Sequence, residues 1–387
     1  MASEEIKIRN FDRQRDTARV VDLESRCEVG PRESFSLFTD TMGDPMCRIR
    51  NSPQYKMLVA ELENDLVGVI RGSIKIVNIG NSSSKGHVQA KLGYVLGLRV
   101  SPCHRRRGIG ATLVHQLEEW FHANHVDYAY MATEKDNEAS IKLFIDKLGF
   151  VKFRTPAILV NPVGHGLIRL SSRIKILKLK KEQAEHLYRK FMGSTEFFPQ
   201  DMDMILSNKL SLGTWVAYPR NESWDGIDED NCAPTSWAIL SIWNTGEVFR
   251  LRVGKAPFAC FLYSKSSDLI NRTFPCLGIP FLPDLFGEFG FYFMYGIHSE
   301  GPKSGKLVRS LCQFAHNMAT SSGDCKVIVT EVGRAKKLRR HIPHWKLLSC
   351  SEDLWCVKPL SCNANKTLFD WTKTPPPPTL FVDPREV

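Results

Sequence analysis

Residues 100–111 read VSPCHRRRGIGA, and this stretch decides the fold because it joins an apolar strand to an amphipathic helix. Its core, Arg105-x-x-Gly108-x-Gly110, fits the pattern (R/Q)-x-x-G-x-(G/A). Glycines let the backbone approach an anion closely, and the amides at a helix N-terminus point toward it. Successive N–H groups in such a turn form an anion-binding concavity, to which Arg106 and Arg107 add positive charge. The stretch therefore predicts a pyrophosphate-binding turn.

Two other phosphate-binding motifs fit less well. The dinucleotide-binding pattern G-x-G-x-x-G is absent from this turn. Gly301–Lys306 has one residue too few between its glycines for a P-loop, and Leu307 follows the lysine.

The residues around the turn alternate between strands and helices. A strand is predicted at Leu92–Val100, and Gly110–Asn124 carries its apolar residues on one helical face. A strand at Tyr128–Thr133 and a helix at Glu138–Leu148 follow, with Gly149 placed to end the helix. The other elements expected in this block are a strand at Ile6–Arg9, helices at Asp16–Cys27 and Pro31–Asp40, strands at Tyr55–Leu62 and Leu66–Val77, a polar loop at Asn78–Gly86 and a strand at Phe150–Val160.

The chain beyond Asn161-Pro162 repeats this order of elements. Gly110 and Gly305 both lie at a loop-to-helix junction and are 195 residues apart, as are Phe150 and Trp345. We interpret the chain as two copies of one α/β fold; a chance likeness of common elements is the alternative. The elements expected in the second copy are strands at Ile174–Leu179, Gly213–Tyr218, Trp237–Trp243, Phe291–Ile297, Lys326–Glu331 and Leu354–Val357, and helices at Lys181–Met192, Asp201–Lys209, Leu307–Ala319 and Arg334–His341. The predicted domains are residues 1–160, a linker at 161–172, a second domain at 173–360 and a Pro-rich tail at 361–387 whose end packs on the body.

Composition excludes several classes of protein. The 387 residues carry 52 Lys and Arg against 42 Asp and Glu, a net charge of +10, and 43% are hydrophobic, so a fully disordered chain is excluded. No run has the length of a transmembrane helix, and the charged start MASEEIKIRN lacks the apolar core of a secretory signal. The eleven cysteines form no C-x-x-C pair, so we expect no metal site and reduced thiols in the cytosol or nucleus.

The positive surplus leaves nucleic acid, a membrane surface or an anionic cofactor open as the partner. Three arginines stand at the pyrophosphate turn, which favours the cofactor over nucleic acid. Direct nucleic-acid binding remains an alternative that rests on charge alone.

The strand YVLGLRV, the loop SPCHRRRGIG and the segment Asn137–Phe150 together resemble the GNAT acetyltransferase superfamily. The last segment is similar to the family signature N-x-x-(A/S)-x-x-L-Y-x-x-x-G-F. The resemblance implies a mixed-sheet α/β architecture of tandem GNAT-like folds, the second degenerate because GPKSGK replaces the glycine pattern. It also implies acetyl-CoA as cosubstrate, with its pyrophosphate on the loop amides and its pantetheine arm along the splayed end of the preceding strand. The cofactor-binding residues so implied are Leu98, Arg99, Val100, Arg105, Arg106, Arg107, Gly108, Ile109, Gly110, Ala111, Asn137 and Ser140.

Further segments along nearly the whole chain, among them CEVGPRESFSLFTDTMGDPMCRIRNSP, TEFFPQDMD and FVDPRE, look like the plant Hookless-type probable N-acetyltransferases. That resemblance implies transfer of acetyl to an amine, a role in differential growth and hormone response, and residence in the nucleus or cytoplasm.

Acetyl transfer needs a base for the amine and an acid for the leaving thiolate. The resemblance places the usual tyrosine acid at Phe144, whose phenyl ring cannot donate a proton. Tyr94, on the strand that would face the substrate cleft, and Glu134, which could act as base through water, are the candidate catalytic residues. A structural role is the alternative for each, as it is for Cys103 and His104 beside the loop.

The acceptor is suggested by a cluster of acids in residues 20–44. The acids are Asp22, Glu24, Glu28, Glu33, Asp40 and Asp44, opposed by Arg26 and Arg32. An acidic rim suits a cationic amine such as a protein lysine, for example in a histone, and a solvated helix face is the alternative. Two further functions stay open: an acyl-CoA-binding regulator with little turnover, because of Phe144, and a nucleic-acid-associated factor.

Overall fold

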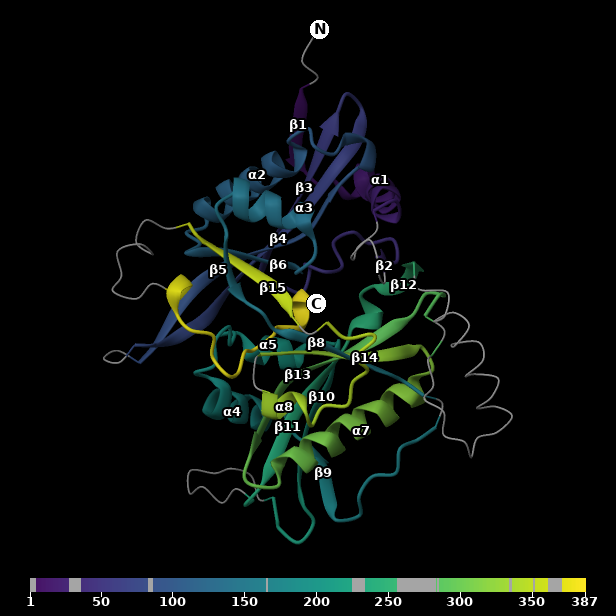
Figure 1. Cartoon of the computed structure of the whole chain (residues 1–387), viewed down its shortest axis with the longest axis vertical. Helices are drawn as coiled ribbons and strands as arrows, with labels where there is room; N and C mark the ends of the chain where they lie inside the picture. The colour runs from purple at the N-terminus through teal and green to yellow at the C-terminus, as the bar shows by residue number, and fades with distance from the viewer. Residues whose placement is uncertain are drawn as a thin grey trace.

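The computed structural model describes residues 5–27, 36–82, 86–164, 166–224, 234–255, 283, 285–333, 336–350, 352–360 and 371–387. These residues form a seven-stranded sheet, a six-stranded sheet and a separate two-stranded pair. Figure 1 shows the two large sheets as an upper and a lower half, with the C-terminus between them.

The first sheet has the strand order β1-β3-β4-β5-β6-β15-β7. Its strands are β1 (Ile6–Asn10), β3 (Gln54–Leu62), β4 (Asp65–Ser82), β5 (Gly86–Val100), β6 (Tyr128–Glu134), β15 (Asp353–Pro359) and β7 (Val151–Arg154). The helices of this half are α1 (Arg13–Ser25), α2 (Ile109–Ala123) and α3 (Glu138–Ile141), which continues as a π-helix over Lys142–Lys147. β5 and β6 are parallel, and the other neighbours in the sheet are antiparallel.

The second sheet has the order β8-β14-β13-β11-β10-β9. Its strands are β8 (Ala157–Pro162), β14 (Cys325–Val332), β13 (Gly290–Glu300), β11 (Trp237–Asn244), β10 (Ser211–Pro219) and β9 (Ile174–Lys178). The helices of this half are α4 (Lys181–Met192), α5 (Met202–Ser207), α7 (Ser304–Ser322) and α8 (Lys336–Arg339). β13 and β14 are again the parallel pair.

The two halves repeat one local geometry, which confirms the expected tandem fold. In the first half the parallel pairing ends at Val95 opposite Met131, and in the second it ends at Met294 opposite Thr330. A glycine with a left-handed backbone follows in each case, Gly97 and Gly296, both with φ of 61°. Each half therefore contains a pair of parallel strands that splay apart beyond the same point.

The strands at the end of each half are exchanged, which the sequence did not reveal. A single strand was expected at Phe150–Val160, but β7 and β8 lie in different sheets. Pro156 separates them, and a proline has no N–H with which to continue a sheet ladder. β15, expected in the second copy, lies in the first sheet between β6 and β7. Figure 1 shows β15 in the upper half, beside β6. The sheets therefore do not follow the expected boundaries at residues 160 and 173.

Two further expectations were wrong in part, and one strand was not predicted. Ser36–Asp40 is a strand, β2, and not the end of a helix; residues 31–35 lie outside the described part of the chain. It pairs with β12 (Arg250–Lys255), a strand that the sequence did not predict, because long-range pairing overrides local propensity. The expected loop at Asn78–Gly86 is shorter, since β4 extends to Ser82 and β5 begins at Gly86.

Helix α2 covers one face of the first sheet at close range. Its Leu113, Leu117 and Phe121 are fully buried, as their helical spacing predicts. A Cβ at Gly72 would lie 2.7 Å from Leu117, and one at Gly93 would lie 2.8 Å from Phe121. Glycine at these two positions therefore lets the helix rest directly on the sheet and fixes the turn that precedes it.

The opposite face of the first sheet packs against the second half. One hydrophobic core contains Tyr94 and Tyr130 together with Phe197, Trp371 and Phe381. Buried ion pairs also cross this contact, including Arg154 with Glu196 at 2.6 Å and Lys75 with Glu386 at 2.7 Å. The tail from Trp371 onward is thus part of the core between the halves.

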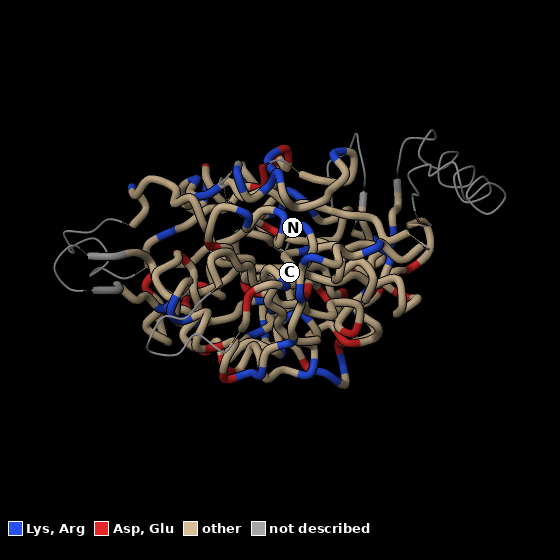
Figure 2. Tube along the Cα trace, turned by 90° about the horizontal axis from the view of Figure 1, so that it is seen from below, with Lys and Arg blue, Asp and Glu red and all other residues tan. Residues whose placement is uncertain are grey.

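Charge is distributed over both halves. Figure 2 shows Lys and Arg positions interspersed with Asp and Glu positions along the trace. The cysteines of the described residues are all free thiols.

Candidate active site

The basic turn leads directly into helix α2. A 3-10 turn at Pro102–His104 follows β5, and Gly108 is the N-cap of α2 with φ of 86°. No side chain caps the helix, and a Cβ at Gly108 would have nothing within 4 Å, so the space beside it is open. Amides at such a helix start favour an anion. The described turn therefore fits the pyrophosphate of an acyl-CoA.

The three arginines of the turn differ in position. Arg105 donates from Nε to the Val100 carbonyl oxygen at 3.3 Å, which ties the turn to the end of β5. Arg106 adopts a left-handed backbone with φ of 66°, an uncommon conformation for a non-glycine residue. All three side chains, including Arg107, are exposed. Their contacts with the cosubstrate stay predictions.

The splayed end of β5 offers backbone groups toward β6. Beyond Val95 its edge facing β6 is unpaired, whereas its other edge pairs with β4 up to Val100 opposite Gly68. Leu98 and Val100 turn their side chains to the core beneath α2. Arg99 points to the opposite face, as alternation along a strand requires.

Several of the residues expected at the cofactor contribute structure as well. Ile109, the first residue of α2, is buried in the core between the helix and the sheet, so only its backbone is available to a ligand. Ala111 packs against the same core. Asn137 caps α3, because its Oδ1 accepts from the Ser140 N–H at 3.1 Å. Phe144 is 3% exposed, with its ring edge-on to Phe150 at 5.2 Å between centroids. Its position in the core gives it no part in proton transfer.

Glu134 ends β6 on the face opposite α2, and a second carboxyl stands beside it. Asp353, the first residue of β15, lies directly opposite Glu134 in the antiparallel ladder. Burial raises the pKa of Asp353 to about 7, and the neighbouring Glu134 acts in the same direction. Burial also raises the pKa of Glu134, whose Oε2 is buried without a hydrogen-bond partner. The two carboxyls therefore have an unused acceptor and pKa values shifted toward neutrality.

A third carboxyl comes from the second half. Glu331, on β14, accepts a hydrogen bond from Nε1 of Trp355 at 3.0 Å. Burial, followed by repulsion from Asp353, raises the pKa of Glu331 well above its usual range. Sequence reasoning found Glu134 but missed Asp353 and Glu331, because strand exchange alone brings them to this face.

Tyr94 projects from β5 on the same face of the sheet as these carboxyls and is paired with Tyr130, four residues before Glu134 on β6. Its ring stacks on Tyr130 with centroids 4.6 Å apart, and it is nearly buried. Burial raises its pKa, and the carboxylates of Glu386, Glu331 and Asp353 act in the same direction. Tyr94 therefore stays protonated, and its hydroxyl is available as a hydrogen-bond donor.

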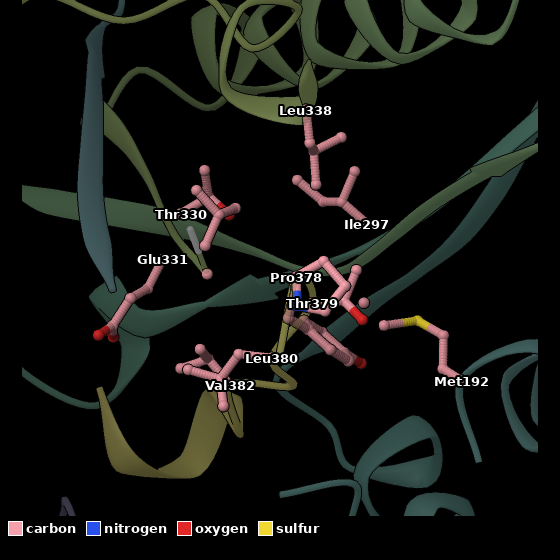
Figure 3. A pocket seen from close by; sticks show the side chains of 13 residues that line it. Met192, Ile297, Thr330, Glu331, Leu338, Pro378, Thr379, Leu380 and Val382 are labelled. Carbon is pink, nitrogen blue, oxygen red and sulfur yellow. The ribbon is translucent and has the colours of Figure 1, made fainter. Parts of the chain in front are cut away.

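The equivalent splay in the second half is closed. Gly305 is the counterpart of Gly110, and a Cβ there would collide with the His341 ring. Gly301, at the turn before α7, is crowded by the Thr235 carbonyl oxygen, whereas Gly108 is open. Pro378, Thr379, Leu380 and Val382 of the tail line the pocket between the splayed strands (Figure 3). The tail thus lies at the position that corresponds to the first splay, and we predict that this half does not bind acyl-CoA.

Two classes of site find no support within the described ranges. No group of three or more His, Cys, Asp or Glu side chains there could hold a metal ion. Among the helices that the structure describes, none combines the length and apolar character that crossing a membrane requires.

The fold and the turn define an acyltransferase of the GNAT class. Residues 18–150 match the acetyltransferase (GNAT) family, and the chain belongs to that family. It is 48% identical to the Arabidopsis thaliana proteins named probable N-acetyltransferase HLS1-like and probable N-acetyltransferase HLS1, over 98% of this chain and 99% of each. It is 34% identical to the acetyl transferase GW6a of Oryza sativa subsp. japonica, over 98% and 97%. These relatives confirm the Hookless-type resemblance.

A solved structure shares the architecture of both halves. The Saccharomyces cerevisiae N-myristoyltransferase with bound myristoyl-CoA matches with a TM-score of 0.56, over 92% of this chain and 79% of that chain. The sequence identity is 11%, so this likeness shows the fold alone.

Proposed function

We propose that this acyltransferase moves an acetyl group from acetyl-CoA to an amine, and that the acceptor is a protein lysine, for example in a histone. The observation that carries the proposal is the position of the β5–β6 splay. An open anion-binding turn lies at one side of it, and the carboxyls of Glu134 and Asp353 lie on the face opposite α2. Bound acetyl-CoA would supply the activated thioester.

Each group at the splay has a role in this proposal. The amides of Gly108, Gly110 and their neighbours bind the pyrophosphate, and the unpaired edge of β5 orients the acyl arm. Glu134 removes a proton from the amine, directly or through water, and Asp353 tunes its charge. Tyr94 donates a hydrogen bond to the leaving thiolate. A pKa near the working pH suits a general base, which favours the Glu134–Asp353 pair.

A turnover assay that follows the free CoA thiol tests this function on panels of histones and peptides. Glu134→Gln keeps the shape of the side chain and removes the base, so we expect kcat to fall by about 10²- to 10⁴-fold. Glu138→Gln is the matched control, because Glu138 is exposed and pairs only with Lys142 at the surface. Equal activity of the two variants would contradict the role of Glu134.

One observation favours a second function. The position expected for the family acid is Phe144, and its ring is buried in the core. Tight binding of acetyl-CoA without turnover on any panel would support an acyl-CoA-binding regulator instead.

The setting in the cell is proposed from the Hookless-type resemblance. We infer residence in the nucleus or cytoplasm and a role in differential growth and hormone response. A fluorescent fusion of the whole chain, scored for position in seedling cells, tests the first part. Exclusion of the fusion from both compartments would contradict it.

A further inference from the structure

Three arginines gather beneath the splayed end of β5, on the face opposite α2. Arg71 extends from β4, Arg99 from β5, and Arg48 from the turns after β2. Burial lowers the pKa of Arg99 to about 10, and the charges of Arg48 and Arg71 add to this effect while Glu24 opposes it. Val69 is paired with Arg99 across the β4–β5 ladder, so Arg71, two residues further on β4, is the diagonal neighbour of Arg99 on the same face. Arg71 also contacts Glu24 and the carbonyl oxygen of Pro45, three residues before Arg48, so the four side chains form one cluster.

The cluster holds more positive than negative charge. Arg71 pairs with Glu24 through Nη1 at 2.8 Å and donates from Nε to the Pro45 carbonyl oxygen at 2.7 Å. Within the described residues, Arg99 donates to the Leu98 carbonyl oxygen at 2.9 Å and to no other acceptor. Arg48 lies over the Phe249 ring at 5.2 Å. In the described part of the chain, no carboxylate besides Glu24 pairs with any of the three arginines.

Donor atoms in the cluster lack acceptors. Nη2 of Arg71 and Nε of Arg48 are buried without a hydrogen-bond partner, and Arg71 is only 2% exposed. A buried donor left unpaired bears the full cost of losing its water, so such groups normally have a partner. Oε2 of Glu24 also lacks a hydrogen-bond partner. It needs a donor, which an anion cannot supply. The free donors of Arg48 and Arg71 call for a ligand with several oxygens, such as a carboxylate or phosphate.

The cluster is adjacent to the proposed reaction centre. Nη1 of Arg71 lies 3.4 Å from the carbonyl oxygen of Gly97. A Cβ at Gly97 would lie 2.7 Å from Nη1 of Arg71. The guanidinium thus lies directly beneath the point where β5 leaves β6. Tyr94 lies three residues before Gly97 on β5 and is paired with Tyr130 of β6, the strand that ends at Glu134 opposite Asp353.

We propose that Arg48, Arg71 and Arg99 form an oxyanion site for the acceptor. The acceptor would present a carboxylate or a phosphate to these arginines and its amine to Glu134 and Asp353. This assignment of substrate class rests on the proposed acetyl transfer. It narrows the acceptors from amines in general to amines that carry a carboxylate or a phosphate nearby, such as a protein lysine beside an acidic or phosphorylated residue.

A thermal-unfolding titration of the full chain tests the site without requiring turnover. The probes are sodium phosphate and sodium acetate, each against sodium chloride at the same ionic strength. Saturating CoA is present, so that the turn at Gly108 is already filled. The variants are Arg48→Gln and Arg99→Gln, and the matched control is Arg50→Gln, which removes the same charge from an exposed side chain two residues from Arg48.

We expect phosphate, acetate or both to raise the Tm of the wild type and of Arg50→Gln. The apparent Kd should weaken by about tenfold or more in Arg48→Gln and in Arg99→Gln, because each loses a charged donor. A response to one probe and not the other identifies a phosphate-bearing or a carboxylate-bearing acceptor. The response should persist in Gly108→Asp, so it can be read even if the chain does not bind CoA.

Two results would overturn the site. One is a wild-type Tm that responds to phosphate and acetate no more than to chloride. The other is an equal response in all variants, which would mean that the arginines are satisfied by the chain itself or by water. If one glutamine variant fails to fold, the other variant still tests the site. The wild-type Tm in phosphate or acetate, compared with chloride, tests it as well. Failure of acetyl transfer with an intact anion response would contradict the proposed function and leave the site standing.

Discussion

Replacing Asp353 by asparagine should make the free energy of unfolding less sensitive to rising pH. The folded protein holds the Asp353 proton up to a pKa of about 7, whereas the unfolded chain releases it near the ordinary value of 3.8. The group therefore contributes stability that is fully present below about pH 4. That contribution is lost as the pH rises through about 7. Asparagine keeps the shape and cannot ionise.

The magnitude follows from the shift. The pKa of Asp353 rises from 3.8 in the unfolded chain to about 7 in the folded protein. Since each pKa unit is worth about 1.4 kcal/mol, the free energy of unfolding falls by roughly 4 kcal/mol by pH 8. Roughly 3 kcal/mol of this falls between pH 5 and pH 8. Asp353 is 6% exposed, so solvent screening reduces the value little, and sharing of charge with Glu134 and Glu331 makes it an upper value.

Urea unfolding at pH 5 and pH 8 measures the effect. The free energy of unfolding of Asp353→Asn minus that of the wild type should be larger at pH 8 than at pH 5, by up to about 3 kcal/mol. Asp146→Asn is the control, because Asp146 is exposed on the π-helix. Its replacement should change the free energy of unfolding by the same amount at both pH values. The same difference between Asp353→Asn and wild type at both pH values would refute a protonated, buried Asp353.

Three other predictions concern catalysis and the contact between the halves. In the wild type, kcat/KM should rise with pH through an inflection above the ordinary carboxyl range, since the base Glu134 must be ionised and burial raises its pKa. Asp353→Asn should shift that inflection, and a pH–rate profile unchanged by the substitution would argue against the pair. Trp371→Ala should lower the free energy of unfolding by about 3–5 kcal/mol, because the side chain is fully buried; a loss below ~1 kcal/mol in urea unfolding would mean that the tail does not belong to the core. Glu196→Gln should cost about 3–5 kcal/mol by leaving Arg154 buried without its charge partner, and a Tm equal to that of the wild type would contradict this.

The local elements near the turn could be predicted from the sequence. The helix at α2 follows from its apolar spacing and from Gly108, and β5 and β6 follow from short apolar runs with turns at their ends. These signals are local, since each depends on residues within one or two turns of chain. The pyrophosphate turn is equally local, because its glycines, its arginines and the start of the helix all lie within twelve consecutive residues, 100–111.

The exchange of strands could not be predicted in this way. β15 pairs with β6 although more than 200 residues separate Asp353 from Glu134, and nothing near Asp353 distinguishes it from a strand of the second half. The missed carboxyls Asp353 and Glu331 follow from this pairing. One member of the expected acidic rim differs for a similar reason, because Glu24 turns inward to Arg71, a residue of another element.

Calorimetric titration with acetyl-CoA tests most directly whether the first splay alone binds the cosubstrate. The comparison is between wild type, Gly108→Asp and Gly323→Asp. Both glycines have a positive φ, 86° and 73°, and open space at the Cβ, so backbone strain is matched. We predict one acetyl-CoA per chain in the wild type and in Gly323→Asp, and no measurable binding in Gly108→Asp. Two sites per chain, or binding that survives in Gly108→Asp, would contradict the account.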